Sequence, residues 1–207
     1  MSSKGGNGTT VTAASFALLS AQRNSPTILI DLCGDIPAVI GLTEPAGTGI
    51  NDWLNETCTQ TFADLMQQCP PVADNLIVIH RGSPYVEGQP RWAELADALR
   101  SLSHNVVIDA GITFVPDSVR HAVTTTTLVT KPCYLSLRRA TNMARPTNVI
   151  LIKEESRALT QRDVSHVLGV PVVAEIPYQA AISRTVDAGL LPNRCQQLFG
   201  DYLAAVL

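Results

Sequence analysis

The sequence lacks the features that mark several large classes of protein. Only 16% of its 207 residues are charged, and the net charge of −3 includes no basic excess that would favour binding to nucleic acid or an anionic membrane. No apolar run reaches the roughly 20 residues that a bilayer-spanning helix needs, and the polar, glycine-rich start is unlike a signal peptide. The five cysteines are odd in number and include no C-x-x-C pair, which argues against a disulfide framework or a structural zinc site. These absences predict a cytoplasmic protein.

Short apolar runs alternate with amphipathic stretches along the chain. The apolar runs show no polar–apolar alternation, which is typical of strands buried on both faces of a parallel sheet. They cover residues 27–32, 76–79, 106–108, 126–129, 149–152 and 170–176. The stretches between them predict helices at 92–99, 133–144, 160–168, 180–188 and 195–206. We therefore expect a single domain over residues 1–207, with a doubly wound α/β fold, a mainly parallel sheet and helices on both faces.

The last predicted helix carries an apolar stripe. Its members are Leu198, Phe199, Tyr202, Leu203, Val206 and Leu207. A membrane-targeting helix would also carry several basic residues, and this one has none beyond Arg194. We expect the stripe to pack on the rest of the domain.

Two carboxylates stand at the ends of predicted strands. Asp31 closes the first apolar run and Asp109 closes the third. Ligands of doubly wound sheets bind at the carboxyl ends of the strands, and a buried carboxylate is costly unless it has a partner. Asp31 and Asp109 are therefore candidates for a functional site at this edge of the sheet.

A glycine-rich segment opens the chain as Lys4-Gly5-Gly6-Asn7-Gly8-Thr9-Thr10. Glycines let backbone N–H groups turn towards an anion, and a helix that starts at about Thr9 would add its N-terminal dipole. A hydroxyl at the end of such a loop is suited to bind Mg²⁺. The segment therefore predicts either a phosphate-binding loop or, from composition alone, a flexible glycine-rich N-terminus.

The segment resembles the loop of the ParA/MinD family of deviant-Walker P-loop ATPases, which reads K-G-G-x-G-K-[ST]-[ST]. Further stretches resemble the family's motifs in the expected order, at residues 28–32, 106–111, 128–138 and 168–178. Residues 34–42 and 49–54 are most similar to the CpaE/TadZ branch of pilus-assembly proteins. The resemblance covers essentially the whole chain.

The resemblance implies a nucleotide cofactor, ATP or ADP with Mg²⁺. The implied cofactor-binding residues are Lys4, Gly5, Gly6, Asn7, Gly8, Thr9, Thr10 and Pro177. The implied Mg²⁺ ligands are Thr10, Asp31 and Asp109, and the implied catalytic residues are Asp31 and Asp35.

Two departures fall on catalytic positions of the family. Thr9 stands where the family has the loop lysine that neutralises phosphate charge, which leaves Lys4 as the only lysine of the loop. Cys33 stands where the family has the aspartate that helps to position the attacking water. Asp35, two residues further on, is a candidate replacement if the backbone bulges there. Because phosphoryl transfer depends on electrostatics and positioning, we expect weakened nucleotide binding and little or no hydrolysis.

Two further departures concern the surroundings of the loop. The family's adenine-reading asparagine is Lys153 here. The family also has a central strand before the loop, whereas only Met1, Ser2 and Ser3 precede Lys4, so we expect that strand to be absent or the recorded start of the sequence to be late.

The resemblance implies a homodimer that organises other components in space, for example in septum placement, pilus localisation or cargo partition, through protein partners. Two alternatives remain open: an active ATPase in which Lys4 and Asp35 replace the missing groups, and a nucleotide-free protein-interaction module. Arg138 and Arg139 make DNA a conceivable partner, but two arginines on a helix more often form a solvated face.

Overall fold

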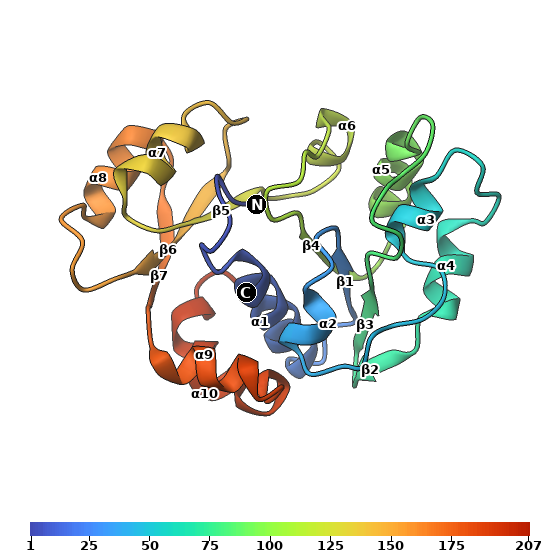
Figure 1. Cartoon of the computed structure of the whole chain (residues 1–207), viewed down its shortest axis with the longest axis horizontal. Coiled ribbons are helices and arrows are strands. Elements are labelled where there is room, and N and C mark those ends of the chain that lie inside the picture. Colours follow the sequence, from blue (N-terminus) through green and yellow to red (C-terminus); the bar gives the residue numbers. More distant parts are fainter.

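The computed structural model describes all residues from 1 to 207 and contains alternating strands and helices (Figure 1). The strands are β1 (Thr27–Asp31), β2 (Pro71–Ala73), β3 (Leu76–Ile79), β4 (Asn105–Asp109), β5 (Thr127–Thr130), β6 (Asn148–Lys153) and β7 (Val172–Pro177). The helices are α1 (Thr9–Gln22), α2 (Ile36–Val39), α3 (Ile50–Leu54), α4 (Phe62–Gln68), α5 (Trp92–Ser101), α6 (Asp117–Arg120), α7 (Tyr134–Ala140), α8 (Gln161–Leu168), α9 (Ala180–Asp187) and α10 (Leu191–Leu203). None of these helices combines the length and the apolar character needed to cross a bilayer.

The strands form two sheets with a division between β4 and β5. The first sheet has the order β2-β3-β1-β4, in which only β2 is antiparallel, and the second is the parallel sheet β5-β6-β7. Met1 and Ser2 lie between the sheets: the Met1 amino group donates to the carbonyl oxygen of Thr127 (3.0 Å), and Ser2 N–H donates to that of Gly111. The predicted mainly parallel α/β fold is confirmed, and no strand is formed ahead of the loop.

Helices cover both faces of the two sheets (Figure 1). Strand side chains point alternately to opposite faces, so Leu29 of β1 and Ile150 of β6 contact one core, whereas Ile28 and Leu151 contact others. The core around Leu29 and Ile150 includes residues of α1, α2 and α10. On the opposite faces, α3, α4 and α5 pack on the first sheet, and α7 and α8 pack on the second.

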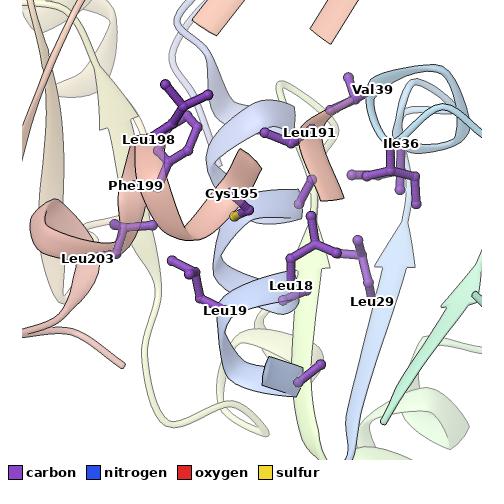
Figure 2. Close-up of a cluster of buried hydrophobic side chains, with 14 of the residues drawn as sticks. Leu18, Leu19, Leu29, Ile36, Val39, Leu191, Cys195, Leu198, Phe199 and Leu203 are labelled. Carbon is purple, nitrogen blue, oxygen red and sulfur yellow. The ribbon is translucent and has the colours of Figure 1, made fainter. Parts of the chain in front are cut away.

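Helix α1 is the centre of the largest core, because it packs on both sheets and on α10 (Figure 2). Leu18 of α1 points towards Leu29 of β1, whereas Leu19 lies on the side of α10 (Figure 2). Cys195 and Phe199 of α10 are at most 1% exposed. The expected packing of the C-terminal apolar stripe on the domain is therefore confirmed, with its most buried member at Leu203.

The boundaries of two predicted helices differ from those of the structure. Helix α10 begins at Leu191, four residues before the predicted start, because Pro192 occupies its first turn, where proline's fixed φ and missing N–H cost nothing. Helix α7 ends at Ala140, whereas the prediction extended it to Ala144. The short helices α2, α3, α4 and α6 and the edge strand β2 were not predicted, since four to seven residues carry too little periodicity.

Candidate functional site

The glycine-rich loop adopts backbone conformations that glycine favours and leads directly into α1. Gly6 and Gly8 have φ angles of +77° and +81°, and Gly8 is the N-cap of the 14-residue helix. A Cβ atom at Gly5 or Gly6 would meet no other atom within 4 Å, so the loop surface here is open. The structure therefore places open backbone at the positive end of a helix dipole.

The N–H groups of this loop have no partners in the chain. No backbone N–H from Gly5 to Val11 donates a hydrogen bond, and the first to do so is that of Thr12, to the carbonyl oxygen of Gly8 (2.9 Å). Free N–H groups at a helix N-terminus attract anions, because dipole and donors act in the same direction. The loop is thus chemically suited to bind phosphate.

Two buried side chains, Ser2 and Asn7, hold the loop through hydrogen bonds. The Ser2 hydroxyl lies 2.8 Å from the carbonyl oxygen of Lys4 and 3.1 Å from that of Val129. The Asn7 amide donates to the same hydroxyl at 2.9 Å, and both side chains are at most 2% exposed. The Asn7 side chain, predicted to bind a cofactor, thus points into the protein, and Ser2 is a structural residue that the sequence did not reveal.

Asp31 is completely buried at the end of β1, and its side chain supports the following turn. One carboxylate oxygen accepts from the N–H groups of Cys33 (2.9 Å) and Gly34 (2.7 Å), and the other accepts from that of Ile36 (3.0 Å). Burial raises the pKa of Asp31, and the three N–H groups offset part of that rise. Asp31, predicted as a metal ligand and catalytic residue, therefore also fixes the turn that follows β1.

Asp109 lies beside Asp31 because β1 and β4 pair in parallel with these two residues in register. One oxygen of Asp109 accepts from the Gly111 N–H (3.1 Å), whereas the other, Oδ2, is buried without a hydrogen-bond partner. Burial raises the pKa of Asp109, and the neighbouring Thr10 hydroxyl lowers it in part. An unpaired buried carboxylate oxygen lowers the stability of the folded protein by roughly 1–3 kcal/mol. A ligand that contacts this oxygen would offset that cost.

Cys33 completes a cluster with the two aspartates. One ligand atom from each of Asp31, Cys33 and Asp109 lies within 4.8 Å of the other two. Burial, assisted by the charges of Asp109 and Asp31, raises the pKa of the Cys33 thiol to about 12. The thiol is therefore neutral at physiological pH as the structure stands, and it does not replace an aspartate as a base.

Asp35 is not a member of this cluster. It is exposed at the N-cap of α2, and its side chain makes no capping hydrogen bond. The preceding Gly34 has a φ of +93° and packs against Arg81, whose guanidinium donates to the Cys33 carbonyl oxygen (2.6 Å). Arg81 and Gly34 line a polar cavity of about 360 Å³ that also includes Asp52. The structure thus tightens the backbone at Gly34 and leaves Asp35 at the surface.

A second cavity, of about 240 Å³, joins the glycine loop to the end of β7. Gly6 and Gly8 line one side, and Pro177 and Tyr178 line the other. Lys131, which follows the fourth predicted strand, also lines it; its ammonium is 2.7 Å from Glu154 and 5.4 Å from the centre of the Tyr178 ring. The cavity offers the apolar walls and few polar groups that a planar organic ring needs.

Several of the predicted residues fall into two groups, and Asp35 belongs to neither. Gly6, Gly8 and Pro177 meet at the second cavity, and Thr10 lies next to the aspartate cluster. Lys153, at the family's adenine-reading position, does not line that cavity, because it is exposed and pairs with Glu175 at 3.5 Å.

We expect Asp109→Asn to stabilise the metal-free protein at pH 7, by on the order of 1 kcal/mol. Because burial raises the pKa of Asp109 above its ordinary value of 3.8, the folded state retains a proton that the unfolded state releases, so this carboxyl costs stability as pH rises. Urea unfolding with EDTA between pH 4 and 8 measures the effect. The gain should shrink as pH falls towards 4; a gain that is absent or independent of pH would contradict the assignment.

No protein-family model and no curated protein matches this chain. Solved structures do match it over nearly its full length. The septum site-determining protein MinD of Pyrococcus horikoshii, complexed with Mg-ADP, is 18% identical with a TM-score of 0.73, over 100% of this chain and 96% of that one. A ParA family ATPase from Chlorobium tepidum is 21% identical with a TM-score of 0.76, over 98% and 95%.

A third match is the MinC:MinD cell division protein complex of Aquifex aeolicus, at 16% identity and a TM-score of 0.70, over 97% of this chain and 93% of that one. Identities this low establish the architecture and leave function to the site itself. The chain therefore has the α/β fold of the MinD and ParA ATPase structures.

Proposed function

We propose that this protein is a ParA/MinD-like nucleotide-binding protein that acts as a dimerising spatial organiser with weak or no ATP hydrolysis. The observation that carries the proposal is the run of unpaired backbone N–H groups from Gly5 to Val11 at the N-terminus of α1. In a fold shared with nucleotide-bound MinD, such a run is best explained as a cradle for the phosphates of a nucleotide.

The nucleotide's base and its metal each have a suitable place near the loop. The cavity between Gly6, Gly8 and Pro177 is the position for the base, because it adjoins the loop and has apolar walls. Thr10, Asp31 and Asp109 fit a divalent cation, since Asp109 Oδ2 is buried without a partner and carboxylate and hydroxyl oxygens are ligands that Mg²⁺ prefers. A bound cation would neutralise negative charge on the phosphates.

The chemistry for hydrolysis is weak in this site. Thr9 supplies no positive charge to the phosphates, and a Cys33 thiol with a pKa of about 12 does not orient water as a carboxylate would. Asp31 already accepts three hydrogen bonds from its own loop, and Asp35 is exposed at the start of α2. These features favour a protein that binds nucleotide and turns it over slowly or not at all.

A nucleotide-dependent dimer and a protein partner fit the surface around the site. Ile112 and Phe114 follow β4 and are 67% and 80% exposed, and Tyr134, which follows β5, is 75% exposed. Large exposed apolar side chains that gather into a patch are typical of protein contacts, so these three are the candidates for such a contact. The MinD of Aquifex aeolicus, which has the same fold, assembles with MinC.

The proposal is tested by combining calorimetry with Mg·ATP, analytical ultracentrifugation and a phosphate-release assay on the purified chain. We expect binding, a shift from monomer to dimer with ATP, and phosphate release that is slow or absent. Turnover as fast as that of an intact family member, and abolished by Lys4→Ala, would overturn the weak-hydrolysis claim in favour of an active ATPase. The lack of any nucleotide binding would overturn the proposal in favour of an interaction module.

Thr9→Lys should restore part of the missing phosphate charge. A charged hydrogen bond contributes about 1.5–3 kcal/mol, which corresponds to a gain in ATP affinity of roughly tenfold or more. Calorimetry should show a larger gain for ATP than for AMP, because AMP lacks the outer phosphates. Thr9→Met, of similar length without charge, is the matched control; an equal gain in that variant would contradict the role assigned to position 9.

A further inference from the structure

The cluster at the ends of β1 and β4 contains a sulfur atom, which is not a ligand that Mg²⁺ prefers. We propose that Asp31, Cys33 and Asp109 bind a divalent cation of the kind that accepts thiolate ligands, such as Co²⁺, Zn²⁺ or Cd²⁺, in preference to Mg²⁺. The inference deepens the metal position of the proposed nucleotide site, but it does not require a nucleotide to be bound.

The three ligand atoms are already close together and held by rigid structure. They lie within 4.8 Å of one another, and the two aspartates are register neighbours on adjacent parallel strands. Cys33 is fixed by its N–H bond to Asp31 (2.9 Å), and its sulfur lies 3.7 Å from the Asp109 carbonyl oxygen. A cation could therefore meet all three side chains with small adjustments of their rotamers.

Free coordinating capacity remains on the oxygen ligands. Asp109 is 0% exposed, and its Oδ2 has no hydrogen-bond partner, so this member of the cluster retains a buried acceptor. Asp31 accepts three N–H bonds, whereas a carboxylate offers about four acceptor positions. Each aspartate thus retains at least one lone pair for a metal.

The sulfur atom has space that only glycine provides. A Cβ at Gly111, which has a φ of +46°, would lie 2.5 Å from the Cys33 sulfur. The absence of a side chain at Gly111 therefore lets the thiol pack directly against the turn after β4, next to Asp109.

All three side chains of the cluster can bind a cation as anions, so a divalent cation would offset their mutual repulsion. Metal binding releases the thiol proton to solvent and forms one metal–sulfur bond, with water completing the coordination. Thiolate selects softer cations, whereas Mg²⁺ demands oxygen ligands in a near-octahedral array.

Cobalt titration of the purified full chain, without nucleotide and after EDTA treatment and desalting, tests the inference. We expect a thiolate-to-cobalt charge-transfer band that saturates at one ion per chain and persists in excess Mg²⁺. Cys33→Ser should abolish the band, and Cys58→Ser, a half-buried cysteine outside the cluster, should leave it unchanged. Asp109→Asn should weaken cobalt binding by at least the ~10–100-fold that loss of an outer-shell partner costs.

The inference is overturned if no charge-transfer band appears, if the band survives in Cys33→Ser, or if excess Mg²⁺ removes it. Circular dichroism of each variant shows that a lost band does not reflect unfolding. A cobalt band without ATP binding would support the metal site and refute the nucleotide proposal. ATP binding in Mg²⁺ without a cobalt band would do the reverse.

Discussion

The packing of α1 against both sheets is the constraint on which the rest of the structure depends. The two sheets share no strand-to-strand hydrogen bonds, so the core around α1 and α10 and the contacts of Met1 and Ser2 join them. Because α1 begins at the glycine loop, the same packing fixes the loop relative to the aspartates of the first sheet and Pro177 of the second. The contacts that join the two sheets therefore also position the parts of the site.

The site holds polar groups in states that stability alone would not select. Asp31 recovers part of its burial cost through three N–H bonds, whereas Asp109 keeps an unpaired oxygen and the loop keeps a run of unpaired N–H groups. Proteins retain such arrangements mainly where a ligand supplies the missing partners. The unpaired carboxylate oxygen would attract a cation, whereas the unpaired N–H groups would attract an anion. A polyphosphate with a bound metal ion contains both.

Much of the fold could be predicted from the sequence, because buried parallel strands appear as continuous apolar runs and Asp31 and Asp109 close two of them. The division of the sheet and the support of the loop by Ser2 and Asn7 could not, since both depend on contacts between residues far apart in the chain. The approach of Cys33 to Asp109 depends on the register of β1 against β4, which no local pattern encodes. Lys131 reaches its cavity for the same long-range reason.

The central claim is that the backbone of the glycine loop receives the phosphates of a nucleotide. Amide hydrogen exchange, measured by mass spectrometry with and without Mg·ADP, tests it most directly, because the N–H groups from Gly5 to Val11 have no partner within the chain. We expect exchange in this segment to slow strongly when the nucleotide is added. Exchange around Tyr178 and Gln179, which line the second cavity, should slow as well. Unchanged exchange in the loop at saturating Mg·ADP would contradict the account.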